Sequence, residues 1–201
     1  MPKPYVPNDK WSQRAAKEGY LARSVYKLME IDARYELIRP GLRVLDIGAA
    51  PGSWLQYTSD KLGPEGRVLG LDLKPISFSA PNVMTKVVDV FDDAAVEAAI
   101  AGMSWQKLDL VLSDIAPNTS GIKDVDQWRS IELNRKIAAI AHRYLRGKGS
   151  VVMKVFRGKD FDMFTHELKT MFKRLKVMSA VASRDRSREV YVVCSEAIHI
   201  A

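Results

Sequence analysis

The feature that most constrains the fold is the regular alternation of short apolar segments with longer amphipathic ones after residue 42. The segments with the apolar, β-branched character of strands are 43–48, 67–73, 83–90, 108–114, 150–156 and 189–195. The segments with helical spacing of their apolar residues are 53–63, 92–103, 126–147 and 161–175. Strands that alternate with helices predict an α/β fold built on a mostly parallel, doubly wound sheet.

The rest of the chain fits a single domain. Two further helices are predicted at 11–19 and 24–35, ahead of the first strand, and Gly63 and Gly147 are expected to end the helices before them. No repeat, low-complexity tract or linker divides the sequence, and 201 residues suit one hydrophobic core. We therefore expect one domain over residues 1–201.

Composition excludes several classes of protein. A hydrophobic fraction of 47% and a charged fraction of 27% are typical of a soluble globular protein. No apolar stretch reaches the roughly 18 residues of a membrane helix, and the N-terminus lacks the apolar core of a signal peptide. Cys194 is the single cysteine, which fits a reducing compartment, so we expect a cytoplasmic protein without membrane association.

The net charge of +7 is concentrated near the two ends of the chain. The basic residues of these clusters are Lys3, Lys10, Arg14, Lys17, Arg23 and Lys27 in the first, and Lys173, Arg174, Lys176, Arg184, Arg186 and Arg188 in the second. Such clusters indicate a polyanionic partner, although a solvated surface would give the same pattern.

Polar side chains follow the predicted strands at their carboxyl ends, where doubly wound sheets bind ligands. These residues are Asp46, Asp72, Asp89, Asp114 and Lys154. A lysine inside the apolar strand 150–156 is unusual, because an ammonium group is costly to bury, although its apolar stem could reach solvent.

The turn after the first strand reads IGAAPGSW, residues 47–54. It lacks the Gly-Lys-Ser/Thr ending of a P-loop and the full G-x-G-x-x-G of dinucleotide sites. Gly48 and Gly52 still allow a tight strand-to-helix turn that a ligand can approach closely. Asp72, at the end of the next strand, suits a ribose diol, and Asp89 suits an adenine amino group. The turn therefore favours an adenosine derivative over a phosphate-rich ligand.

Five segments, in this order, resemble the FtsJ-like family of RNA 2′-O-ribose methyltransferases. They are SVYKLMEID, LDIGAAPGSW, LSDIAPNTSG, VMKVFRG and SRDRSREVYVV. The resemblance implies a Rossmann-like methyltransferase fold with a seven-stranded, mostly parallel sheet and helices on both faces. It also implies S-adenosyl-L-methionine as the cofactor.

The resemblance carries specific roles onto this sequence. Lys154, Lys27, Asp114 and Glu189 match the family's catalytic tetrad, with Lys154 as the base that removes the proton of a ribose hydroxyl. The implied cofactor-binding residues are Asp46, Gly48, Gly52, Trp54, Asp72, Asp89 and Asp114, although Trp54 could instead anchor its helix to the sheet. The expected RNA-binding residues are Arg23, Lys27, Arg184 and Arg186. A basic N-terminal extension at 1–23 is also expected to contribute to RNA binding.

The function implied is methyl transfer from S-adenosyl-L-methionine to the 2′-hydroxyl of a ribose, a uridine ribose, in large-subunit ribosomal RNA, with the assembled large subunit as substrate. The alternatives are the same reaction on tRNA or an mRNA cap, a non-catalytic ribosome-assembly module that binds RNA, and an NAD-dependent oxidoreductase. His142, His166 and His199 show no metal-ligand spacing, so no metal is expected. We expect a monomer.

Overall fold

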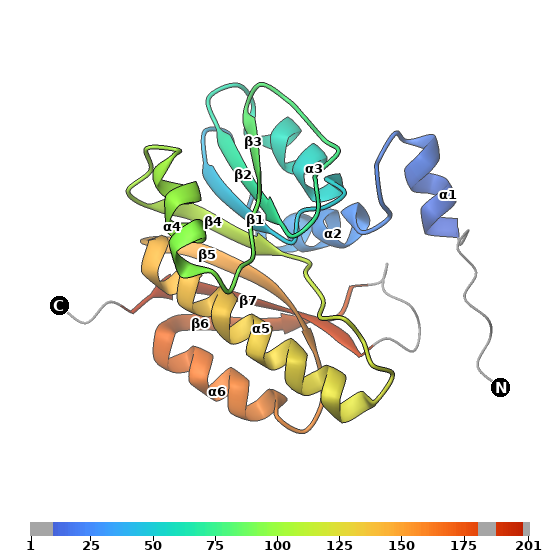
Figure 1. Cartoon of the computed structure of the whole chain (residues 1–201), viewed down its shortest axis with the longest axis vertical. Coiled ribbons are helices and arrows are strands. Elements are labelled where there is room, and N and C mark those ends of the chain that lie inside the picture. The colour runs from blue at the N-terminus through green and yellow to red at the C-terminus, as the bar shows by residue number, and fades with distance from the viewer. Residues whose placement is uncertain (1–9, 181–187, 199–201) are drawn as a thin grey trace.

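The computed structural model describes residues 10–180 and 188–198 (Figure 1). Its helices are α1 Lys10–Lys17, α2 Val25–Tyr35, α3 Ser53–Leu62, α4 Asp93–Ala101, α5 Lys123–Tyr144 and α6 Phe161–Met171. Its strands are β1 Arg43–Ile47, β2 Arg67–Asp72, β3 Val83–Val87, β4 Leu108–Ser113, β5 Leu145–Phe156, β6 Phe172–Met178 and β7 Glu189–Ala197.

The strands form one seven-stranded sheet in the order β3-β2-β1-β4-β5-β7-β6. Neighbours from β3 to β5 pair in parallel, whereas β7 runs antiparallel to both β5 and β6. The prediction of a seven-stranded, mostly parallel sheet is confirmed. The strand order reverses between β1 and β4, and at such a switch point ligands bind beyond the carboxyl ends of the strands.

Helices cover both faces of the sheet (Figure 1). Buried residues of α4, α5 and α6, such as Ile100, Ile137 and Phe164, form one core cluster with one face. Leu28 of α2 and Leu55 of α3 pack with the opposite face in a second cluster. The outcome is a three-layer α/β arrangement, which follows from the period-3.6 pattern of each helix and the largely apolar strands.

Several predicted boundaries are wrong, and the two largest errors at helix ends concern α6 and α5. The helix expected at 161–175 ends at Met171, and Phe172–Met178 forms the edge strand β6 paired with β7. Its charged side chains, including Lys173 and Arg174, suit an edge that must not pair with a second molecule. The helix expected to reach Gly147 ends at Tyr144, because β5 already begins at Leu145. Gly63 does follow the last residue of α3, as predicted.

Among the described residues, none of the helices is both long and apolar enough to cross a membrane.

Candidate active site

The register of β5 and β7 places three polar side chains on one face of the sheet. Lys154 of β5 lies opposite Tyr191 of β7, and Phe156 lies opposite Glu189. Because side chains alternate along a strand, Lys154, Glu189 and Tyr191 share the face that α2 and α3 cover. Tyr191 packs in the core cluster on that side, and Lys27 of α2 reaches the same place.

The four residues of the predicted tetrad come together in this structure. The Lys27 ammonium donates to both Glu189 carboxylate oxygens, at 3.0 and 3.1 Å. The Lys154 ammonium lies 3.1 Å from Asp114 Oδ1 and 3.8 Å from Glu189 Oε1, and it donates to the Asp114 backbone carbonyl. Both lysines are buried, so two cations and two carboxylates form one connected cluster.

Tyr191 belongs to this cluster, and sequence reasoning missed it. Its hydroxyl donates to Asp114 Oδ1 at 2.6 Å, the same oxygen that pairs with Lys154. Burial raises the pKa of the Tyr191 phenol well above its ordinary value, and the neighbouring Asp114 carboxylate adds to the shift. The signal in the sequence was its position two residues after Glu189, since such residues share one face of a strand.

Asp46 lies fully inside the sheet on β1, 1% exposed. Its Oδ2 has no hydrogen-bond partner among the described residues. Burial raises the pKa of the Asp46 carboxyl well above its usual range, and the carboxylates of Asp114 and Asp72 add to this. The carboxylates of Asp72 and Asp114, whose charges add to this shift, give the carboxyl ends of β2 and β4 a negative potential that suits a cationic ligand.

The turn glycines are required by the backbone and by packing, and the close approach of a ligand to the turn stays a prediction. Gly48 and Gly52 both have positive φ, +79° and +120°, a region that favours glycine. A Cβ on Gly48 would lie 2.6 Å from Ile115 Cβ, and one on Gly52 would lie 2.5 Å from Phe78 Cβ. The glycines therefore let the turn pack against the protein's own side chains.

Asp72 is fixed by that turn. Its Oδ2 accepts from the Ala50 N–H at 2.9 Å and its Oδ1 from the Lys74 N–H at 2.8 Å. Asp89 accepts from the Phe91 N–H at 2.9 Å. Each carboxylate oxygen has two lone pairs, so both residues keep acceptor capacity for a ligand.

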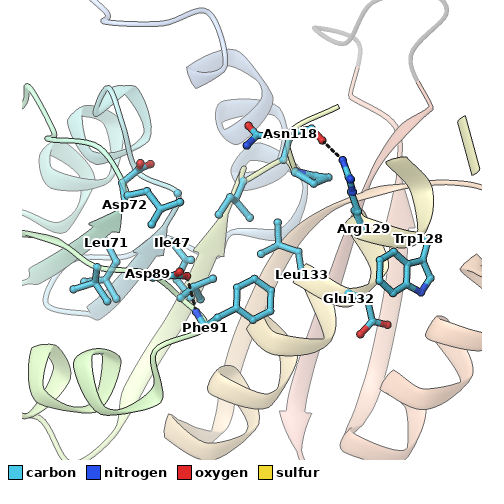
Figure 2. Close-up of a pocket in the computed structure, with 17 residues that line it drawn as sticks. Ile47, Leu71, Asp72, Asp89, Phe91, Asn118, Trp128, Arg129, Glu132 and Leu133 are labelled. Atoms are coloured by element: carbon cyan, nitrogen blue, oxygen red, sulfur yellow. Dashed lines mark hydrogen bonds between the residues drawn. The ribbon is translucent and has the colours of Figure 1, made fainter. Parts of the chain in front are cut away.

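A cavity of about 530 Å³ opens at the carboxyl ends of the strands. Figure 2 shows Asp72 and Asp89 on one side of it and Trp128, Glu132 and Leu133 of α5 on the other. The residues that sequence reasoning missed at this cavity include Phe91, Trp128, Arg129 and Glu132. Trp128 and Phe91 are both exposed, and large exposed aromatic residues beside a cavity indicate a ligand site. The sequence does not show that they lie beside a cavity, so this signal could be used only with the folded structure.

Comparison with known proteins decides the class of enzyme. The family model for FtsJ-like methyltransferases matches residues 20–197. The chain belongs to this family. It is therefore a methyltransferase, as predicted, and the oxidoreductase alternative is wrong.

Relatives of this FtsJ-like methyltransferase align over nearly their whole length. A protein of Azoarcus sp. (strain BH72) named ribosomal RNA large subunit methyltransferase E is 45% identical over 92% of this chain and 90% of its own. One of the same name from Myxococcus xanthus (strain DK1622) is 43% identical, over 96% and 91%. A solved Plasmodium falciparum structure described as a ribosomal RNA methyltransferase has a TM-score of 0.80 at 28% identity, covering 89% of this chain and 98% of its own.

Trp54 takes a structural place in this methyltransferase. It is 3% exposed, its indole N–H donates to the Ser24 carbonyl at 2.9 Å, and its ring packs 6.1 Å from the Tyr191 ring. The described walls of the 530 Å³ cavity do not include it. These contacts fit the alternative in which Trp54 anchors α3, and contact with a cofactor stays a prediction.

The predicted RNA-binding residues are only partly described. Arg184 and Arg186 lie outside the described residues. Arg23 lies half-buried just before α2, and Lys27 is held by Glu189 inside the cluster. The neighbouring α1 presents the Arg14 guanidinium over the Trp11 and Tyr26 rings, at 5.9 and 4.7 Å from their centroids. Cations and aromatic rings together are typical of RNA-contacting surfaces.

Proposed function

We propose that this methyltransferase transfers a methyl group from S-adenosyl-L-methionine to the 2′-hydroxyl of a ribose in large-subunit ribosomal RNA. The observation that carries the proposal is the connected cluster of Lys27, Glu189, Lys154 and Asp114 at the carboxyl ends of the strands. When a ribose hydroxyl oxygen attacks the methyl group, the proton of that hydroxyl must be removed. The lysine side chains of this cluster can supply an amine as the base.

The residues of the cluster have distinct tasks in this reaction. The Lys154 ammonium first releases a proton to solvent, and the neutral amine then accepts the 2′-hydroxyl proton. Asp114 fixes the position of the Lys154 nitrogen, and the Tyr191 hydroxyl holds Asp114. Lys27 stabilises negative charge that develops on the ribose oxygen or holds the adjacent phosphate, and Glu189 orients Lys27. Rigid placement of these groups lowers the entropic part of the barrier.

The cavity fits the proposed cofactor. When bound, S-adenosyl-L-methionine supplies a methyl group carried by a sulfonium. The thioether that remains after methyl transfer is a good leaving group and needs no acid catalyst. The positive charge of the sulfonium suits the neighbouring carboxylates of Asp72 and Asp114. Asp72 would accept from the ribose hydroxyls, and Asp89 would accept from the adenine amino group. Gly48, Gly52 and Trp54 would support this site through the turn that they pack.

The choice of large-subunit ribosomal RNA rests on the names of the relatives and on the two basic clusters of the sequence. A uridine as the target and the assembled subunit as the substrate belong to the same proposal. The monomeric state and the cytoplasmic location stay predictions.

The test offers radiolabelled S-adenosyl-L-methionine and three acceptors side by side: unmethylated large subunits, free ribosomal RNA and tRNA. The labelled RNA is then digested to nucleosides. Label in a 2′-O-methyl nucleoside from large subunits is the expected result. Label in tRNA alone would favour the alternative substrate, and label in a base rather than a ribose would contradict the proposed chemistry.

A further inference from the structure

A second, smaller cavity of about 220 Å³ lies beside the charged cluster, where α5 begins and β7 begins. Lys123, Asp126 and Gln127 line it from α5, Phe156 from the end of β5, and Arg188 from just before β7. Figure 1 places the starts of α5 and β7 and the end of β5 at the same end of the molecule. The volume is several times the roughly 30 Å³ that one water occupies in the liquid.

Gln127 is the unusual residue of this cavity. Its side chain is 2% exposed, yet neither its amide nitrogen nor its amide oxygen has a hydrogen-bond partner among the described residues. Buried amides are nearly always paired in folded proteins, because an unpaired one is destabilising. A leucine at this position would avoid that cost, so stability alone does not account for the glutamine.

The Gln127 side chain occupies space that only a glycine at position 158 leaves open. A Cβ on Gly158 would lie 2.6 Å from Gln127 Cγ and 2.9 Å from its Cδ. Glycine at 158 therefore leaves the room that the Gln127 side chain occupies. Its backbone is not in the positive-φ region, so packing is the reason for this glycine.

The other walls complete a site for a nucleotide. A carboxamide offers one donor beside one acceptor, which is the pattern on the hydrogen-bonding edge of a nucleobase. Lys123 and Arg188 are exposed cations suited to a phosphate, and Phe156 lines the cavity at the end of β5. Asp126 also lines the cavity, and its carboxylate is held by the loop before α5, since it accepts from the Ser120 and Gly121 N–H groups.

The ends of β5 and β7 connect the cavity to the charged cluster. Phe156 pairs in register with Glu189, whose carboxylate holds Lys27, and Arg188 immediately precedes Glu189. The Arg157 N–H also donates to the Arg188 carbonyl at 2.9 Å, which fixes the junction of the two strands. Building on the proposed function, we infer that this cavity binds the base of a nucleotide next to the methylated one, and that the Gln127 amide recognises its edge.

The first test replaces Gln127 with leucine, which keeps the volume and removes the amide. The expected result is an unchanged or higher Tm and an unchanged cofactor Kd, with the KM for large subunits raised roughly tenfold. Gln106→Leu is the matched control, because Gln106 is exposed before β4, at the opposite end of the sheet. A lower Tm with an unchanged KM would show a structural glutamine and overturn the inference.

The second test combines the Gln127→Leu variant with altered RNA substrates in a double-mutant cycle. Large subunits are reconstituted with ribosomal RNA in which one neighbour of the methylated nucleotide has been made abasic by ligation of a synthetic segment. For one of the two neighbouring nucleotides, removal of the base should lower the kcat/KM of the wild type roughly tenfold. The same removal should change the kcat/KM of Gln127→Leu little, because that variant already lacks the contact. Independent effects at both neighbours would overturn the inference.

The outcomes separate the inference from the proposed function. Wild-type protein that methylates no RNA would contradict the proposed function and the inference together. Wild-type activity that Gln127→Leu retains in full would contradict the inference alone. Gly158→Ala, which pushes the amide out of place, should reproduce the KM change with the chemistry step intact in single-turnover measurements.

Discussion

Tyr191 positions the Asp114 carboxylate, which in turn positions the Lys154 ammonium. Its hydroxyl and the Lys154 ammonium share one oxygen of Asp114, at 2.6 and 3.1 Å. Removing the hydroxyl leaves that oxygen a single partner and frees the carboxylate to rotate. Tyr191→Phe should therefore lower kcat about tenfold with little change in KM, while stability falls by about 1 kcal/mol.

Steady-state kinetics on large subunits and thermal unfolding check this prediction. Tyr144→Phe is the control, because the Tyr144 hydroxyl has no partner among the described residues and lies on the other face of the sheet. Equal kinetics for the wild type and the Tyr191 variant would remove Tyr191 from the positioning of Lys154.

Asp46 makes the stability of the ligand-free protein depend on pH. Its folded-state pKa is raised by burial, so the unfolded state loses its proton first as the pH rises. Stability contributed by the protonated carboxyl is present below about pH 4, the ordinary aspartate value, and is lost as the pH rises towards the folded pKa. Asp46→Asn mimics the protonated form.

Thermal unfolding without cofactor, measured as a function of pH, tests this point. Compared with the wild type, Asp46→Asn should lose less Tm as the pH rises above about 4. Parallel Tm curves for the two proteins would mean that Asp46 does not titrate with a raised pKa.

At the scale of elements, α5 is tied to α6 by Arg135. Its guanidinium donates to both Glu167 carboxylate oxygens, at 2.6 and 2.8 Å, and also to Glu132. These groups are partly exposed, so water screens the interaction. Arg135→Met should cost about 0.5–1 kcal/mol, a Tm decrease of about 1–4 °C, and should leave methyl transfer unchanged.

The matched control for this measurement is Arg143→Met. Arg143 also lies on α5, but its pair with Glu97 at 3.1 Å is more exposed, so a smaller Tm decrease is expected. Identical Tm values for the wild type and the Arg135 variant would show that α5 and α6 are held by their apolar contacts alone.

The limits of sequence reasoning also appear at the element scale. The strands that carry Asp46 and Asp72 were predictable, because each is a short apolar run with an aspartate at or next to its end. Of the strand that carries Lys154, only the apolar part from residue 150 was predictable. Strand β6 was not, because Phe172–Met178 continues the helix-favouring pattern of α6 and becomes a strand only by pairing with β7. Tertiary pairing there outweighs local propensity.

The residues of the candidate site were also only partly predictable from the sequence. Lys154 and Asp114 follow from strand-end chemistry, whereas Lys27 and Glu189 came from the family resemblance, because nothing local pairs residues 162 positions apart. The unpaired amide of Gln127 could not be predicted, since whether a glutamine has a partner depends on contacts that only the folded chain defines.

At the scale of the whole molecule, the basic clusters are expected to dominate RNA affinity. Each cation that contacts a phosphate releases counterions, so log K falls by about 0.7–0.9 per contact and per unit of log salt. Arg23→Gln together with Arg186→Gln should weaken RNA binding and reduce the salt slope by up to about 1.4–1.8.

Binding titrations at several salt concentrations measure that slope. Arg39→Gln with Lys148→Gln is the control pair, since both residues are exposed and lie at or near the amino end of the parallel strands. A slope unchanged in the Arg23 and Arg186 variant would mean that the two clusters are solvated surface.

The central claim is that Lys154 removes the ribose proton, and single-turnover methyl transfer to large subunits by Lys154→Met tests it most directly. Methionine keeps most of the buried stem and removes the amine, and Lys148→Met makes the same change at an exposed position of β5. We predict that Lys154→Met transfers methyl groups at least about 100-fold more slowly, with a near-normal Kd for S-adenosyl-L-methionine, whereas Lys148→Met matches the wild type. Transfer by Lys154→Met at the wild-type rate would contradict the account.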